Sequence, residues 1–415
     1  MDPVILGNRL RGARERRGLS QQTVAEALDI PRTGITNIEA GTRSVSTVEL
    51  TQLADLYGKP PGAFLTDVDV QTEEISVAIP RALPELQHLP GFETAVRRIL
   101  DLCRIGADLR RQLDQHRVSA VPNYAAGIHS TTEAIRQAEI VAAEERRRLG
   151  LGHAPVANLA EIISSEGIWV AAADLPDDFS GLFLNHPDVG LAILVNGGHS
   201  PVRRRFSHAH EYAHALFDRE EGISATRRSN ASALVEKRAN AFAAAFLMPA
   251  EGVNEQLQQL KKGYPSRLTQ TIFDVANNSM SDTEIRPPSG SQTITYQDVA
   301  IIAKHFIVSY EAAAWRLRSL NRLSQAEAHE LVAQKNFGNL YLRLLEFSDL
   351  VDDHPNPASA SEREKELQGE LIRLATEAFR REEISNGKLR EIAIKIGLPS
   401  NEVISLARAA GRHDR

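Results

Sequence analysis

The 415-residue chain has few of several residue types that would point to particular protein classes. Its single cysteine, Cys103, excludes an internal disulfide, so any metal site must use histidine and carboxylate ligands. Aromatic residues make up only 5%, while alanine and leucine are abundant, which favours helices over sheets. No apolar run approaches the roughly 18 residues that span a bilayer, and the start, MDPVILGNRLRG, has no apolar signal core. We therefore expect a cytoplasmic protein without membrane contact.

Positive charge is not in excess either. The formal net charge is −6, so the overall charge gives no drive toward nucleic acid, and any DNA contact must come from a local surface. Hydrophobic residues make up 42% and charged residues 25%, as in soluble globular proteins. The length is too great for one compact domain, so two or three domains are expected.

Residues 1–66 have the pattern of several short helices joined by tight turns. Apolar residues recur at helical spacing, Ser20 stands where it can cap a helix, and Ser46 with Glu49 forms a capping box. Such short helices are typical of a helix-turn-helix unit, whose second helix enters the major groove of DNA. A small helical bundle that contacts other proteins is the alternative.

Six polar residues of the two central helices are candidates for DNA contact, at a helix N-terminus or facing outward between buried isoleucines. They are Gln21, Gln22, Arg32, Thr33, Thr36 and Asn37. The stretch RGLSQQTVAEALDIPRTGITNIEAG, with the tail ELTQLADLYG, resembles the XRE-type (Cro/repressor-like) helix-turn-helix family. Ile30-Pro31 replaces that family's small turn residues. The resemblance implies binding to a double-stranded DNA operator.

Residues 67–118 are expected to form a linker and one long helix. The stretch TDVDVQTEEIS is acidic and polar, and apolar residues recur at helical spacing from Phe92 to His116. We favour a spacer between domains. The second interpretation is a homodimer contact, which a regulator that reads two half-sites would need.

The stretch FSHAHEYAHALF, residues 206–217, combines an apolar helix face with three histidines. His210 and His214 are four residues apart, so both imidazoles can reach one ion from the same helix face. Glu211, beside the first of them, can take a proton from a water molecule at that ion, as in zinc hydrolases with the H-E-x-x-H spacing. Without a third ligand, the segment is also compatible with a histidine-rich core helix.

The third ligand of an open zinc site must come from elsewhere in the chain. Phe217 and Glu220 stand where a metzincin has glycine and histidine, which excludes that class. Asp218 lies about 12 Å from His210 along a straight helix, too far to share an ion.

The next helix, ALVEKRANAFAAAFLMP, offers a carboxylate at Glu236. Asn240 lies one turn further on, where its amide can hydrogen-bond a metal ligand. A second helix that supplies a glutamate would complete a His-His-Glu site. A solvated surface charge is the alternative for Glu236.

Residues 119–252 resemble the ImmA/IrrE-type zinc metallopeptidases. RRRFSHAHEYAHALF and EKRANAFAAAFLMP match the family's two metal-site helices. GIWVAAADLPDDFSGLFLNHPDVGLAILVN matches three short strands before them, including Gly181 and Asn196. The resemblance implies Zn²⁺ as the cofactor.

This resemblance also implies the role of each site residue. The zinc ligands would be His210, His214 and Glu236, with Glu211 as the general base. No residue can be matched to an oxyanion-stabilising group. In zincins an extended peptide pairs with an edge strand beside the metal, and GLAILVNG or SGLFLNH is the expected edge.

The remaining third is expected to be mostly helical. Residues 253–335 would comprise a flexible connection, including the polar stretch 277–292, and a helix-turn-helix-like helical unit with a packing role. Residues 336–415 would form a helical C-terminal region. The expected fold class is therefore α+β, predominantly α, with a helix-turn-helix domain, a zincin-like metallopeptidase domain that contains a small sheet, and a helical end.

Together these patterns predict a DNA-binding transcriptional regulator with a zinc-dependent endopeptidase domain. The family resemblance implies cleavage of a specific repressor- or antitoxin-like protein in a stress response, and cleavage of the chain itself is an alternative. A non-enzymatic repressor, whose zinc domain senses a ligand or protein, is the competing hypothesis. The third hypothesis is a general peptidase whose DNA-binding domain only localises it.

Overall fold

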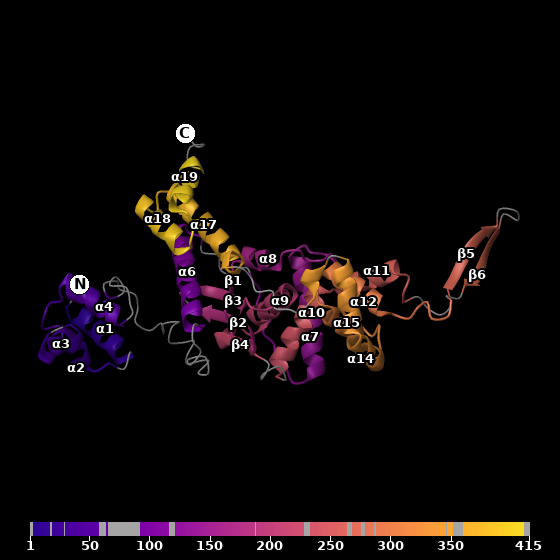
Figure 1. The fold of residues 1–415 in the computed structure, drawn as a ribbon, viewed down its shortest axis with the longest axis horizontal. Coiled ribbons are helices and arrows are strands. Elements are labelled where there is room, and N and C mark those ends of the chain that lie inside the picture. The colour runs from indigo at the N-terminus through magenta and orange to yellow at the C-terminus, as the bar shows by residue number, and fades with distance from the viewer. Residues whose placement is uncertain are drawn as a thin grey trace. The chain divides into compact units, whose positions relative to one another are not determined.

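Figure 1 shows the chain as a computed structural model, which divides into two units, Met1–Glu73 and Glu74–Arg415. The predicted class, α+β and predominantly helical with one small sheet, is confirmed. The structure describes residues 3–16, 19–28, 30–57, 64, 92–115, 121–186, 188–227, 233–263, 268–274, 279–285, 288–345, 347–351 and 360–410. No helix within these ranges is long and apolar enough to cross a membrane.

The first unit is built from short helices around its own apolar core. Ser20 accepts a hydrogen bond from the Thr23 amide at the start of the second helix, as a capping residue should. Ser46 and Glu49 bond each other's backbone amides at the start of the fourth. The helices are α1 (Pro3–Arg16), α2 (Gln21–Ala27), α3 (Arg32–Glu39) and α4 (Thr47–Tyr57).

The second unit contains a four-stranded sheet in the order β1-β3-β2-β4. The β1–β3 pair is parallel and the other two pairs are antiparallel. The three strands expected before the histidine-rich helix are confirmed, and the fourth, after that helix, was not foreseen. The strands are β1 (Trp169–Ala173), β2 (Phe179–His186), β3 (Gly190–Asn196) and β4 (Ile223–Arg227).

The sheet order corrects the expected peptide-binding edge. GLAILVNG falls in β3 and SGLFLNH in β2, and both strands have a hydrogen-bonded neighbour on each side. Neither can therefore add a peptide strand, and that expectation is wrong. The edges of this sheet are β1 and β4.

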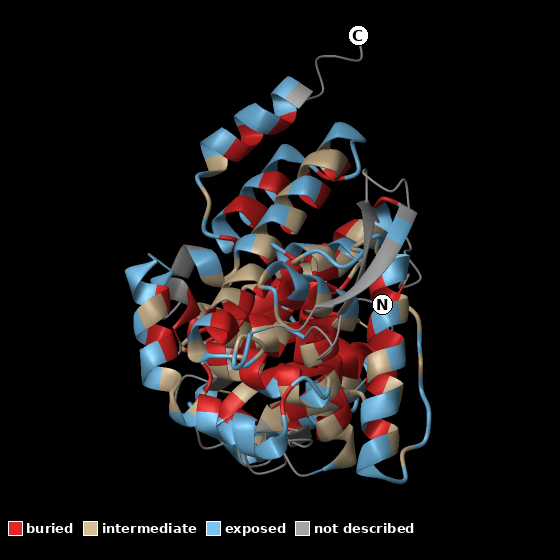
Figure 2. Ribbon diagram, turned by 90° about the vertical axis from the view of Figure 1, so that its right-hand side faces the viewer, coloured by how far each residue is buried: buried red, intermediate tan, exposed pale blue. Residues whose placement is uncertain are grey.

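One face of the sheet is covered by the helices that carry the candidate site. Side chains alternate across a strand, and Val170 and Ala172 of β1 point into this core. Helices α8 (Leu159–Ser165) and α9 (Pro201–Phe217) contact the strands, α10 (Leu234–Leu247) packs on α9, and α7 (Thr131–Arg148) packs on α10. Figure 2 shows the buried residues gathered inside the unit and the exposed ones on the outward sides of its helices.

The opposite face is covered by helices from both ends of the second unit. Trp169, Ala171 and Ala173 of β1 pack there against α6 and α17. Arg110 of α6 lies over the Trp169 ring at 3.8 Å and donates to Glu370 of α17 at 2.9 Å. Helix α6 therefore packs on the sheet of the second unit and does not serve as the predicted spacer between domains. The helices are α6 (Phe92–Gln112), α17 (Lys365–Arg380), α18 (Asn386–Lys395) and α19 (Ser400–Ala410).

The remaining helices bury their apolar faces in the same core as α9 and α10, which agrees with the packing role expected for the helix-turn-helix-like unit. They are α11 (Ala250–Gln259), α12 (Tyr296–Phe306), α13 (Tyr310–Ser319), α14 (Gln325–Ala333) and α15 (Lys335–Leu344). A short α16 (Ala360–Arg363) precedes α17. The stretch 277–292 was expected to be a connection, but it includes strand β6 (Ser279–Ile285), which pairs with β5 (Leu268–Asp274) in a hairpin.

Candidate metal centre

The helix that carries the histidines, α9, is buried along most of its length. Ser200 caps its first turn by accepting a hydrogen bond from the Arg203 amide, and Pro201 occupies the first position, where no amide hydrogen is needed. Every residue from Ala209 to Phe217 is buried. Because the sheet covers one side and α10 another, polar side chains on this helix must find partners inside the protein.

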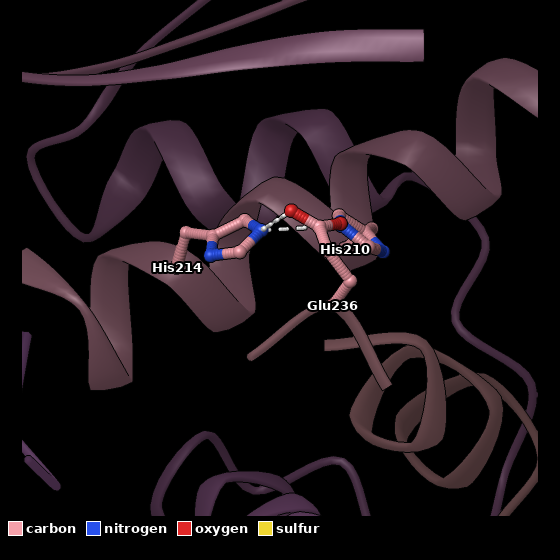
Figure 3. Close-up of side chains that lie close together, drawn as sticks. All are labelled: His210, His214 and Glu236. Carbon is pink, nitrogen blue, oxygen red and sulfur yellow. Dashed lines mark hydrogen bonds and ion pairs between the residues drawn. The ribbon is translucent and has the colours of Figure 1, made fainter. Parts of the chain in front are cut away.

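The structure brings His210, His214 and Glu236 together, as Figure 3 shows. Glu236 lies in the first turn of α10, and its Oε2 is 3.1 Å from Nε2 of His210. The two Nε2 atoms are 3.2 Å apart, and His214 Nε2 is 3.8 Å from Glu236 Oε1. One ligand atom from each residue lies within 4.8 Å of the others. Two imidazoles and one carboxylate form a donor set that zinc accepts.

Glu211 provides a test of whether a cation and its water fit here. Its side chain is 0% exposed, and among the described residues neither carboxylate oxygen has a hydrogen-bond partner. Burial raises the pKa of Glu211, while the charges that His210 and His214 can carry oppose that shift. A buried carboxylate without a partner is costly. A water molecule and a cation at the neighbouring cluster would supply the missing contacts, so the residues fit the implied metal.

A second set of contacts orients the two histidines. His210 Nδ1 lies 3.0 Å from Asn240 Oδ1, and His214 Nδ1 lies 2.9 Å from Asp218 Oδ2. The other Asp218 oxygen accepts a 2.6 Å hydrogen bond from Arg238, whose guanidinium lies 4.4 Å from the Phe217 ring centroid. With both Nδ1 atoms engaged, the Nε2 atoms are directed at the same point.

The sequence only partly indicated this second set. The Asn240 side chain lies where the helical spacing placed it. Asp218 was considered only as a ligand, although its spacing of four residues from His214 also allows the hydrogen bond that it makes. Arg238 was missed because its contact depends on how α10 packs against the end of α9, which no local pattern reports.

Gly181 of β2 fixes where the Glu211 side chain lies. A Cβ atom at this position would lie 2.5 Å from Glu211 Oε1 and 2.8 Å from two further atoms of that side chain. We therefore expect Gly181→Ala to displace the Glu211 carboxylate and lower any hydrolytic activity by roughly a hundredfold, with the metal content unchanged. Initial rates and metal analysis of one preparation measure both quantities. Gly369→Ala on α17, where a Cβ meets nothing within 4 Å, is the matched control.

Asp218 is expected to strengthen metal binding through His214. Asp218→Asn keeps the shape of the side chain but removes the charge that stabilises a donating His214 Nδ1–H, so zinc should bind about 10- to 100-fold more weakly. Competition with a chromophoric chelator measures the change. An unchanged affinity would mean that the Asp218–Arg238 pair serves the packing of α9 and α10 alone.

The candidate DNA-binding residues lie in the first unit. Arg32, Thr33, Thr36 and Asn37 are all exposed on α3. Gln22 is exposed on α2. The remaining candidate, Gln21, is half-buried: its amide donates to Glu39 at 2.9 Å and its oxygen accepts from Thr36 at 3.3 Å. Gln21 therefore also joins α2 to α3, which fixes how the outer surface of α3 is presented.

A buried ion pair supports this arrangement. Arg14 of α1 donates to both carboxylate oxygens of Glu39, at 2.6 and 3.1 Å. The same Glu39 accepts from Gln21, so one carboxylate connects α1, α2 and α3. Bidentate arginine–carboxylate pairs impose a defined geometry.

Comparison with known proteins agrees with this division of the chain. Residues 5–63 match the family model described as "Helix-turn-helix domain", and residues 163–318 match the one described as "IrrE N-terminal-like domain" (Peptidase_M78). Among solved structures, the chain is similar to that of PlcR from Bacillus thuringiensis in complex with the peptide PapR7 and DNA, at 12% identity over 99% of this chain and 98% of that one, with a TM-score of 0.16. No curated protein matches the chain.

Both resemblances expected from the motifs are thereby confirmed, and each candidate site falls within one match. The exposed α3 residues lie in the first matched range, and the His210–His214–Glu236 cluster lies in the second. The chain therefore carries an N-terminal helix-turn-helix domain and an IrrE N-terminal-like domain, and these two domains support a DNA-binding regulator.

Proposed function

We propose that the IrrE N-terminal-like domain of this regulator is a zinc-dependent endopeptidase that acts on one protein partner. The partner would be a repressor- or antitoxin-like protein, or this chain itself, cleaved in a stress response. The observation that carries the proposal is the buried His210–His214–Glu236 cluster, with the carboxylate of Glu211 beside it and without a hydrogen-bond partner among the described residues. A core helix with no chemical role would not need a buried carboxylate at that position.

The residues of the chain divide the reaction between them. A zinc ion, when bound, would polarise the scissile carbonyl and acidify a water molecule. His210, His214 and Glu236 would hold that ion, since both histidine Nδ1 atoms are already engaged. Glu211 would take a proton from the attacking water and return it to the leaving nitrogen, so that one peptide bond and one water molecule become a carboxylic acid and an amine.

Strand β4 is the best-placed edge for an extended substrate. Among the described strands it pairs with β2 alone, and an extended peptide would pair with an edge strand. Thr226 of β4 pairs with Gly181 of β2, and a Cβ atom at Gly181 would lie 2.5 Å from Glu211 Oε1. A peptide added to this edge would therefore run beside the proposed general base.

Digestion of candidate partners tests the proposed function. The zinc-loaded protein is incubated with repressor- and antitoxin-like proteins encoded beside it, and alone, and the products are identified by intact-mass spectrometry. Cleavage at one defined position that stops when zinc is chelated supports the proposal. A zinc-loaded, folded protein that cleaves none of them would favour a sensor domain, and general digestion would favour an unspecific peptidase.

DNA binding is expected to depend on the exposed surface of α3. Arg32→Ala removes the one arginine of α3 and should weaken binding to a selected operator about 5- to 100-fold. Selection from a random duplex pool with the wild-type protein supplies the operator, and fluorescence anisotropy measures the affinity. Gln52→Ala, an exposed change on α4, serves as the control. A two-fold symmetric operator would indicate a homodimer. An unchanged affinity for Arg32→Ala would place the contact on another surface.

A further inference from the structure

A cavity of about 450 Å³ lies beside the candidate metal centre, between α7, α9, α10 and α13. Most of its wall is apolar. The apolar side chains that define it include Ile135, Val202, Phe206, Ala241, Ala244 and Trp315. The volume falls in the range of cavities that bind ligands.

Asn240 lies between the cavity and the candidate metal centre. This side chain lines the cavity and also contacts His210 Nδ1 at 3.0 Å. Phe206 lies one turn before His210 on α9, and Asn240 lies one turn after Glu236 on α10. One turn of helix rises about 5.4 Å, so the cavity begins roughly that far from the cluster.

That distance suits a peptide substrate. Residues of an extended chain are spaced about 3.4 Å apart. If the scissile bond lies at the metal centre, the side chain of a residue one or two positions away can reach the cavity. The side chain that enters it would therefore sit next to the cleaved bond, on the His210 side.

The charged residues that line the cavity do not indicate a charged ligand. Arg316, which is 2% exposed, is paired with Glu139 and donates to the Met248 carbonyl. Arg203 is the other charged lining residue. Trp315 and Ile135 are 40% and 42% exposed, which is unusual for large apolar side chains beside a cavity. An apolar group that entered the cavity would cover them.

We propose that this cavity binds a large apolar side chain of the substrate, such as leucine, methionine or phenylalanine, next to the scissile bond. The proposal rests on the proposed peptidase function and states which kind of substrate sequence the peptidase would select. Ala241 and Ala244 are the positions that keep the cavity open, because any larger side chain there would project into it. Burial of a side chain of this size is sufficient for at least tenfold selectivity over alanine.

The test separates peptide binding from cleavage. Zinc-loaded Glu211→Gln protein is used to select binders from a displayed library of random peptides, and the best peptide is then synthesised. Its affinity is measured by fluorescence anisotropy for Glu211→Gln alone and combined with Ala244→Phe, which fills the cavity. The combination with Ala409→Phe, an exposed change on α19, is the matched control. Ala241→Leu is a milder filling variant if Ala244→Phe does not fold.

The expected result is enrichment of one large apolar residue at a fixed position. Its replacement by alanine, or the Ala244→Phe change, should weaken binding at least tenfold, and Ala409→Phe should not. The same preference without any cleavage by the wild-type protein would support the cavity and overturn the peptidase. Cleavage without an apolar preference, or a preference unchanged by both filling variants, would overturn the cavity and leave the peptidase standing. A library that yields no binder to the zinc-loaded protein would also overturn the cavity proposal.

Discussion

Glu211→Gln is expected to lower cleavage of the substrate by about a hundredfold to ten thousandfold while the protein keeps its zinc. The amide has the size of the carboxylate but cannot accept the proton of the attacking water. Glu211 does not belong to the cluster of three close ligand atoms, so the metal content should stay the same. Initial rates and metal analysis on the same preparation measure the two effects separately.

The fold should tolerate this change. Glu211 is fully buried and burial raises its pKa, so the neutral amide removes an unfavourable buried charge from the metal-free protein. The melting temperature of that form should therefore not fall. Glu220→Gln, an exposed change just after α9, is the matched control and should cleave normally. A Glu211→Gln protein that cleaves at the wild-type rate would remove Glu211 from the proposed role.

Glu236→Ala is expected to weaken zinc binding by more than about a hundredfold. Loss of an orienting partner alone costs 10- to 100-fold, and Glu236 would be a direct ligand. Wild-type protein should bind about one zinc ion per chain, and the variant should lose it during dialysis against a weak chelator. Elemental analysis measures the content, and chelator competition measures the affinity.

Thermal unfolding gives an independent measure of the same site. A ligand at a hundred times its dissociation constant stabilises the folded state by about 2.7 kcal/mol. Added zinc should therefore raise the melting temperature of the wild-type protein and not that of Glu236→Ala. Glu251→Ala, an exposed change on α11, should respond as the wild type does. A folded wild-type protein that takes up no zinc would leave residues 206–217 as a histidine-rich core helix.

The elements with a strong periodic pattern could be predicted from the sequence. The helices around His210 and Glu236, and the three strands before them, all formed where their apolar spacing and motifs indicated. Strand β4 was missed because its five residues, ISATR, carry little apolar alternation. It forms because β2 offers an open edge. The hairpin 268–285 was missed for a similar reason, since a polar stretch that includes NNSMSDTEI looks like a connection.

The candidate site shows a similar division between local and tertiary information. His210 and His214 share a helix face by spacing alone, whereas the choice of Glu236 needed the second helix and the family motif. The contacts of Arg238 depend on the packing of that helix and could not be foreseen. The position of Gly181 in the motif was visible, but its reason, close approach to Glu211, was not.

The helices that cover the back of the sheet determine where the chain can be cut. Residues 163–318 match the IrrE N-terminal-like domain, yet α6 precedes that range and α17 follows it. A fragment trimmed to the matched range would leave Leu182, Leu184 and Leu194 of the central strands facing water, because their covering helices would be gone. A soluble fragment that keeps the candidate metal centre must therefore begin before Phe92 and extend through α19. Expression trials that follow the family boundaries would yield aggregates, even if every residue of the metal centre were present.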